Sequence, residues 1–428
     1  MFLPVPDQGI RGAAFVMNKT PLLLVSAVLC AGCTVSEVVT ADKTELNVAS
    51  LDIAENMLLD VGIINFETGL PEENDPDESG IYPEVREAET RYLPYHLKTT
   101  LQGTGYWGAV RVIPSRYVFT DVILSGVIES SDGEFVTLRI KAEDSMGREW
   151  YEKDYEMQTG ITSYSESRDR TQDPYQKVFN DIANDLRSHA AAVTPQDVTR
   201  IRQVSELRFF GDMAPEVYAE YLVTDKDGVT TPVRLTATND PMVDRLRQIR
   251  ERDRLVIDTL NEHYANFYYG VAIPYESWRK AAREQAVSYR QVKRSAALRA
   301  LLGVVVVAGS MSIDTSSSSR SSARAKQAAQ YVGINRGINT IISSWQLRSS
   351  ANIHRENIKE LSESFGAEAA PMVVQVEGES RRLTGTAEAQ YESWRKLLKE
   401  IYQVETGFSE AIDVGVPARS AQQQQPTG

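Results

Sequence analysis

The sequence predicts an α+β fold, in which an N-terminal α/β sandwich is followed by a mainly α-helical region with short β-hairpins. Two patterns indicate this fold. From residue 55 to residue 190, the predicted order is strand, helix, strand, three-stranded meander and helix. From residue 241 onward, apolar residues recur mostly at steps of three and four, which is the period of an amphipathic helix.

The first strand is predicted at Leu58 to Phe66, a continuous apolar run that is typical of a buried strand. A helix follows from Pro83, a residue favoured at the first helical position, to Gly103. Pro94 lies inside this helix, where we expect a kink. One side of the helix collects Val85, Tyr92, Leu93, His96, Leu97 and Leu101.

Four further strands and a helix complete this region. Turn sequences at 131–133 and 145–147 separate the last three strands, which indicates an antiparallel meander. The strands are expected at 109–113, 121–129, 135–143 and 149–156, and the helix from Asp173 through Leu186. We expect the helices to cover one face of the sheet.

These segments resemble the periplasmic α/β domain that is shared by CsgG-type curli secretion lipoproteins, the TolB N-terminal domain and LpoB-type penicillin-binding-protein activators. The resemblance covers residues 55–190 and is one of fold. It departs from CsgG in two ways: Pro114 to Thr120 leaves no room for a further helix, and paired long insertions for barrel hairpins are missing, so the pore function is not implied. The matching segments are LLDVGIINF, AVRVIP, DVILSGVI and VTLRIKAEDSMGREWYEKDYE.

The stretch from Met17 to Cys33 reads as a secretory signal peptide. Lys19 supplies the positive charge, Pro21 to Leu29 forms the apolar core, and small residues precede Cys33. We expect translation to start at Met17. An uncleaved membrane helix is the alternative, but Pro21 to Gly32 is far shorter than the roughly 20 residues that cross a bilayer.

The end of this stretch resembles a bacterial lipobox, which implies that Cys33 becomes the lipidated N-terminus. The position three before the acceptor is usually Leu, whereas here it is Cys30, with Leu29 one residue further back. With Cys30 as acceptor, Leu29 would occupy the cleavage site, where a small residue is needed, so Cys33 is preferred. The residue after Cys33 is Thr34 and not Asp. In bacterial lipoproteins an Asp at this position favours retention in the inner membrane, so its absence implies the outer membrane.

The charge of the chain and its few cysteine and histidine residues argue against several classes of binding site. The formal net charge of −13 disfavours a nucleic-acid partner, because an acidic chain repels phosphates. The only cysteines are Cys30 and Cys33, so we expect no disulfide and no cysteine metal site. The four histidines lie far apart, and we expect no cofactor and no small-molecule substrate.

Catalytic motifs are missing from the sequence: it has no GxSxG, GxxxxGK[ST] or HExxH pattern, so we expect a protein that is not an enzyme. Asp75, Asp77 and Gly80 match the first half of a calcium-binding EF-hand loop, but Arg86 stands where the loop needs a bidentate Glu. A solvated acidic loop is therefore the preferred interpretation, with weak metal binding as the alternative.

The second half of the chain is predicted to be mainly helical. A connecting segment at 190–204 and a hairpin with strands at 218–223 and 233–237 lead to a helix start at Pro241. We expect this helix to break at 270–274 and a second helix to run from Tyr275 toward Leu302. A hairpin at 372–376 and 381–383 and a helix at 387–404 close the folded part, the helix with Tyr391, Trp394, Leu398 and Ile401 as its apolar stripe.

Two pairs of glycines bracket a Ser-rich linker at 315–322. They resemble a glycine-zipper hairpin, in which small residues let two helices approach closely. The apolar run 300–313 would be only about 21 Å long as a helix, against a hydrocarbon thickness of about 30 Å. A close-packed buried hairpin and a membrane or self-association contact both remain open for Gly303, Gly309, Gly333 and Gly337.

The hexapeptide Tyr-Glu-Ser-Trp-Arg-Lys occurs twice, at 275–280 and 391–396. In one interpretation it is a duplicated helix start with each Trp as a core anchor. In the other it is a duplicated surface that grips a partner, because Trp, Tyr and Arg are favoured at interface hot spots. The partner-contact candidates are Tyr275, Trp278, Arg279, Tyr391, Trp394 and Arg395.

The sequence thus favours a non-enzymatic, lipid-anchored protein of the outer membrane that faces the periplasm and acts as a scaffold or adaptor in cell-envelope assembly. Its partners would be the membrane and either an envelope protein or further copies of itself. An oligomeric secretion or pore component of CsgG type is the alternative, and an enzyme acting on peptidoglycan or polysaccharide ranks last.

The predicted parts are a signal peptide with a lipobox (1–33), a tether (34–54), the CsgG/TolB-N-like α/β domain (55–190), a connector with a β-hairpin (191–240), a mainly helical domain with a glycine-rich apolar hairpin (241–407) and a disordered tail (408–428).

Overall fold

The computed structural model describes residues 43–70, 81–165, 168, 172–310, 355–360, 363, 372–376 and 379–406. These residues belong to one compact unit that runs from Thr40 to Gly428. The signal peptide, Cys33, the Asp75/Asp77 loop, Gly333 and Gly337, the Ser-rich linker and the tail lie outside the described residues.

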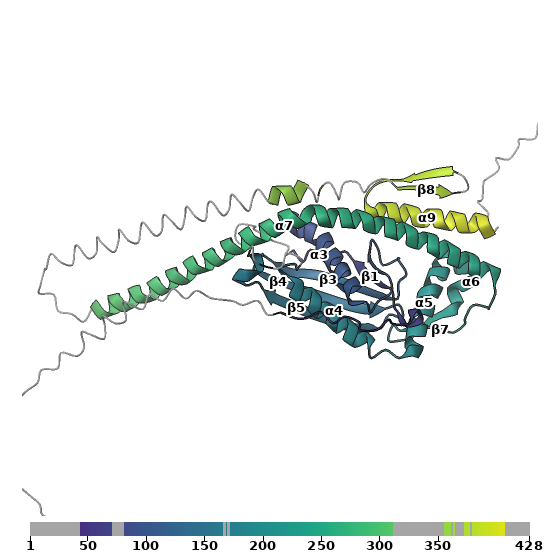
Figure 1. Ribbon diagram of the computed structural model, residues 1–428, viewed down its shortest axis with the longest axis horizontal. Coiled ribbons are helices and arrows are strands. Elements are labelled where there is room, and N and C mark those ends of the chain that lie inside the picture. The colour runs from purple at the N-terminus through teal and green to yellow at the C-terminus, as the bar shows by residue number, and fades with distance from the viewer. Residues whose placement is uncertain are drawn as a thin grey trace, which may run out of the picture. The chain divides into compact units, whose positions relative to one another are not determined.

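A five-stranded mixed sheet forms the centre of the fold, in the order β2-β1-β3-β4-β5 (Figure 1). β1 is parallel to both of its neighbours, whereas β3, β4 and β5 form the antiparallel meander that the turn sequences predict. The mixed α and β composition of the fold is confirmed. The strands are β1 (Val61–Ile64), β2 (Val110–Ile113), β3 (Val122–Ser131), β4 (Phe135–Asp144) and β5 (Glu149–Gln158).

Strand β4 shows why the sheet has one buried and one open face. Its residues alternate, so Leu138 and Ile140 are fully buried while Arg139 between them is exposed. Helices α3 (Pro83–Thr104) and α4 (Gln176–Ala190) pack against each other, and α4 also contacts β5. All six residues of the predicted apolar side of α3 are buried, and the helix ends at Gly105, whose φ of +69° suits a glycine.

A helix that the sequence analysis missed lies in the predicted connecting segment. α5 (Pro195–Met213) starts with Pro195 at its first position, and Thr194 Oγ1 accepts a hydrogen bond from Asp197 N at 3.2 Å. The Thr-Pro start signal and the spacing of Val198, Ile201 and Val204 were both readable in the sequence. The segment 190–204 is therefore largely helical.

The hairpin after α5 forms with shorter strands than predicted. A short helix, α6 (Pro215–Tyr218), leads into strands β6 (Leu222–Thr224) and β7 (Thr230–Pro232). Asp225 Oδ1 accepts hydrogen bonds from Asp227 N and Val229 N, both at 2.9 Å. This tight turn reverses the chain within a few residues, so the second strand begins at Thr230 instead of Val233.

The helix predicted from Pro241 is continuous for 70 residues, as α7 (Pro241–Ser310), so the predicted break at 270–274 is wrong. Pro274 removes one backbone N–H, but Val271 and Tyr275 on either side of it are fully buried, and this packing holds the helix together. The hairpin of β8 (Met372–Val376) and β9 (Glu379–Leu383) and the helix α9 (Ala387–Thr406) confirm the hairpin and the helix predicted for this part of the chain. α9 packs along α7 (Figure 1).

Helix α7 also closes one edge of the sheet. The side-chain amide of Asn261 accepts a hydrogen bond from Val112 N at 2.9 Å and donates one to Val112 O at 2.8 Å. Asn261 thereby takes the place of a neighbouring strand beside β2. Because an exposed strand edge can pair with other chains, this contact both satisfies and protects the edge.

We expect Asn261→Leu to lower the free energy of unfolding by about 2 kcal/mol, because both backbone groups of Val112 lose their buried partner. Urea denaturation of the purified chain measures this change. Glu262→Ala, at the exposed neighbouring position, is the control and should stay within about 0.5 kcal/mol of the wild type. Equal effects of the two substitutions would contradict this role of Asn261.

Candidate functional site

The two copies of the hexapeptide lie in the helices that cover the body: the first in α7 and the second in α9. Tyr275, Trp278 and Arg279 of the first copy are at most 1% exposed. Tyr391 and Trp394 of the second copy are 1% and 4% exposed. A buried side chain contacts its own chain, so this burial favours the structural interpretation of the repeat over partner contact.

The first copy forms a buried ion pair with the body. The guanidinium of Arg279 donates to both oxygens of Asp173, at 2.8 and 2.7 Å, and the side chains are 1% and 7% exposed. Burial by itself would raise the pKa of Asp173, but the charge and hydrogen bonds of Arg279 outweigh it and hold this pKa well below its usual range. The pair therefore stays ionised at neutral pH and ties α7 to the segment before α4.

A second carboxylate, Glu89 of α3, lies beside this pair. It accepts hydrogen bonds from the Tyr275 and Ser131 hydroxyls, both at 2.5 Å, and pairs with Arg86 at 3.0 Å. Burial raises the pKa of Glu89, against the opposing attraction of Arg86. Glu89 thus joins α3, β3 and α7 at one buried point.

The surrounding side chains are aromatic. The Arg279 guanidinium lies 4.2 Å from the ring centre of Tyr275 and 4.6 Å from that of Tyr175, which adds cation–π attraction. The turn between β3 and β4 also approaches here: Gly133 has a φ of +84°, and a Cβ on it would collide with the Arg279 backbone. The sequence therefore needs a glycine at this position.

His96 belongs to the same cluster as a neutral side chain. Its Nδ1 lies 2.7 Å from the Tyr268 hydroxyl and its Nε2 lies 2.9 Å from Gln176 Oε1. Burial lowers the pKa of His96, and because Gln176 Oε1 can only accept, Nε2 carries the proton and Nδ1 accepts from Tyr268. Both ring nitrogens are therefore used to join α3 to α7 and α4.

The second copy repeats this chemistry between α9, α7 and α5. Trp394 Nε1 and the Tyr391 hydroxyl donate to Asp253 of α7, at 3.1 and 3.4 Å. Arg395 pairs with Asp212 of α5 at 2.6 Å, and the side chains are 17% and 19% exposed. In both copies, the Tyr bonds a buried carboxylate and the Arg pairs with an Asp of another element, and we call these two arrangements the first and second latch.

Asp253 is the carboxylate with an unusual pKa in the second latch. Burial raises its pKa to about 6, although the hydrogen bonds from Trp394 and Tyr391 oppose the shift. The group is therefore close to half-protonated in mildly acidic solution, and keeping its buried charge at neutral pH lowers the stability of the fold.

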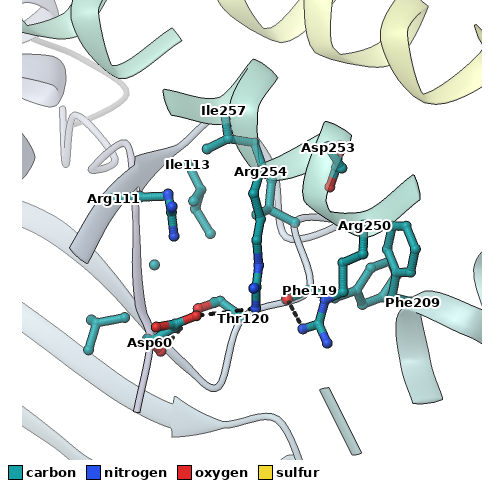
Figure 2. Close-up of a pocket in the computed structure, with 13 residues that line it drawn as sticks. Asp60, Arg111, Ile113, Phe119, Thr120, Phe209, Arg250, Asp253, Arg254 and Ile257 are labelled. Carbon is teal, nitrogen blue, oxygen red and sulfur yellow. Dashed lines mark hydrogen bonds and ion pairs between the residues drawn. The ribbon is translucent and has the colours of Figure 1, made fainter. Parts of the chain in front are cut away.

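A small cavity lies between α7, the strands β1 and β2, and the loop before β3. Figure 2 shows Arg254 reaching from α7 to Asp60, 3.4 Å away, and Arg250 donating to the Phe119 carbonyl at 3.0 Å. The cavity measures about 20 Å³, which is room for a single water molecule. The charged groups that line it hold α7 on the body.

The described ranges contain no group of three or more His, Cys, Asp or Glu side chains placed to bind a metal ion. Within the same ranges, no helix is both long enough and apolar enough to cross a membrane. Gly303 and Gly309 lie in α7, whereas their predicted partners Gly333 and Gly337 are outside the described residues.

The sequence analysis missed the buried acidic residues of both latches, because a lone Asp or Glu usually lies on the surface. A signal was available for two of them. Glu89 falls between Val85 and Leu93 on the apolar side of α3, and Asp253 lies between Ile249 and Val256 in α7, at steps of three and four. A charge in such a position is a candidate for a buried, partnered group.

A scan against protein-family models, a search of curated proteins and a search of solved structures each give no match for this chain. The fold and its contacts define a mixed α/β body to which two helices, α7 and α9, are attached by buried carboxylates.

The first latch should carry much more stability than the second. We expect Arg279→Met to lower the free energy of unfolding by about 4 kcal/mol, because it leaves the Asp173 charge buried without a partner. Arg395→Met, at the matching position of the other hexapeptide, should cost about 1 kcal/mol because that pair is partly solvated.

Urea denaturation measures both values, and the double variant Arg279→Met/Asp173→Asn should recover part of the loss. Equal effects at positions 279 and 395 would contradict the difference between the two latches.

Asp253→Asn should stabilise the chain at neutral pH. The pKa of Asp253 is about 6 in the folded state and 3.8 in the reference state, so its stabilising contribution is complete below about pH 4 and is lost as the pH rises through 6. Between pH 4 and pH 7, the wild type should lose about 2 kcal/mol relative to Asp253→Asn.

The free energies of unfolding of both chains, measured by urea denaturation at several pH values, test this. Asp244→Asn, at an exposed position of the same helix, should follow the wild type. Parallel pH curves for the wild type and Asp253→Asn would contradict a raised pKa.

Proposed function

We propose that the protein is a non-enzymatic lipoprotein, anchored through Cys33 in the outer membrane, that acts in the periplasm as a scaffold or adaptor in cell-envelope assembly. The observation that carries this proposal is the signal-peptide and lipobox pattern from Met17 to Cys33. An acyl chain attached to a folded body suits a tethering role, because the lipid fixes the location while the body remains free to bind.

The arrangement of the body supports a scaffold. The ionisable groups of the two latches bond to each other across α3, α7, α5 and α9, so they serve to hold these elements together. This use of the ionisable groups favours a binding protein over an enzyme acting on peptidoglycan or polysaccharide.

A relationship to the CsgG, TolB N-terminal and LpoB-type domains is part of the proposal. Its support is the segment order in residues 55–190 together with a mixed five-stranded sheet in which α4 packs on β5. The relationship would place the protein among periplasmic partners of secretion or cell-wall synthesis.

An oligomeric secretion component is the second candidate. The observation in its favour is that α7 continues as a helix through Gly303 and Gly309 to Ser310, in the most apolar run of the mature chain. Light scattering of the lipidated protein in mild detergent distinguishes the two functions: a discrete large ring supports secretion, whereas a monomer or dimer supports an adaptor.

In a Gram-negative host, we expect the wild-type chain to incorporate labelled palmitate and to fractionate with the outer membrane. Cys33→Ala should lose the label and appear in the soluble periplasmic fraction, because the acyl chains are the anchor. Cys30→Ala is the control and should behave as the wild type. A Cys33→Ala chain that stays in the membrane fraction would contradict the anchor.

A further inference from the structure

The two edges of the sheet differ. The β2 edge is closed by Asn261 of α7, whereas β5 is the last strand on the other side. Among the described residues, none forms a strand ladder with the outer edge of β5, which is ten residues long. Such an edge offers a row of backbone donors and acceptors to an added strand.

The register tells which backbone groups of β5 face outward. Thr159 N donates to Glu134 O at 2.7 Å, and from Phe135 opposite Gln158 to Ala142 opposite Tyr151 the pairing continues without a shift. In an antiparallel ladder, hydrogen-bonded pairs alternate with non-bonded ones. The backbone groups of Glu152, Asp154 and Glu156 therefore point away from β4.

The side chains on the open face of the sheet alternate in charge from strand to strand. Glu129 of β3 pairs with Arg139 of β4 at 2.9 Å, and Arg139 pairs with Asp154 of β5 at 3.0 Å. Lys141 of β4 likewise pairs with Glu149 of β5 at 3.1 Å. The rows end on acidic residues at the β5 edge, so a basic residue would continue each of them.

The same charges disfavour a second copy of this chain at the edge. Glu152, Asp154 and Glu156 share one face of β5 and are all exposed. If two β5 strands paired in either direction, acidic side chains would lie opposite acidic side chains, which is destabilising. On the other face, which packs on α4, Tyr151 and Met157 are half-buried.

We propose that the outer edge of β5 binds an extended segment of a partner protein, which adds a strand to the sheet and carries Lys or Arg at every second position with apolar residues between them. The basic residues extend the row that ends on Asp154 and lie beside the exposed Glu152 and Glu156, and the apolar residues meet Tyr151 and Met157. This inference rests on the proposed adaptor function and names the chemistry of its partner.

The test is fluorescence anisotropy of a labelled peptide of alternating Lys and Val, as long as β5, titrated with the full chain in a non-ionic detergent. We expect saturable binding, and binding of a Glu/Val peptide at least about tenfold weaker. On binding, the backbone amides of Asp154 and Glu156 should become protected from hydrogen exchange.

Two variants separate backbone pairing from charge attraction. Glu152→Lys/Glu156→Lys should weaken binding about tenfold, whereas Glu216→Lys/Glu220→Lys, at exposed sites outside the sheet, should not change it. Glu156→Pro removes one outward N–H without touching the ladder to β4, so it should weaken binding while the urea midpoint stays unchanged.

Equal binding of the Lys/Val and Glu/Val peptides would overturn the proposal. So would weakening by the charge variant alone, with Glu156→Pro and the exchange of Asp154 unaffected, because this would mean attraction without an added strand. A dimer that Glu156→Pro dissolves would assign the edge to a second copy instead. None of these outcomes bears on the lipid anchor, which the fractionation of Cys33→Ala tests separately.

Discussion

The fold depends most on the buried ion pair between Arg279 and Asp173. Removing two charges from water costs several kcal/mol per ion, and only a well-formed ion pair offsets this desolvation penalty. Here two short hydrogen bonds and the cation–π contacts with Tyr275 and Tyr175 offset it. Because few orientations of α7 satisfy this geometry, the pair fixes the helix on the body. Asn261 lies about five turns, or roughly 27 Å, earlier on the same face of α7 and reaches β2 there, so two points set its position.

Helix α9 is attached by the same chemistry at a different cost. Its Arg395–Asp212 pair is partly solvated, and its buried carboxylate, Asp253, has a raised pKa. The duplicated hexapeptide therefore supplies one strong attachment and one whose acceptor is a carboxylate that burial disfavours in its charged form. The strong attachment lies where α7, α3 and the sheet meet, and the weaker one holds the C-terminal helix α9.

The position of α7 also decides which part of the sheet remains available. By closing the β2 edge, the helix leaves the β5 edge and the charged open face beside it as the accessible side of the sheet. The acidic residues of β5 protect this edge from self-pairing and, by the same physics, select a basic partner. The proposed lipid anchor and the proposed strand edge are compatible, because Cys33 and β5 are different parts of the chain.

Sequence reasoning predicts the strands of the meander, the limits of α3 and the apolar stripe of α9, because these depend on local periodicity and turn residues such as Gly133. It did not predict the continuity of α7 past Pro274, since packing of Val271 and Tyr275 overrides the local cost of the proline. Only the tertiary structure decided that Glu89, Asp173 and Asp253 are buried partners of the repeated hexapeptide. From the sequence alone, an isolated acidic residue is expected to lie on the surface. Burial becomes favourable only when folding places a hydrogen-bond donor beside it, and here each donor is more than a hundred residues away in the sequence.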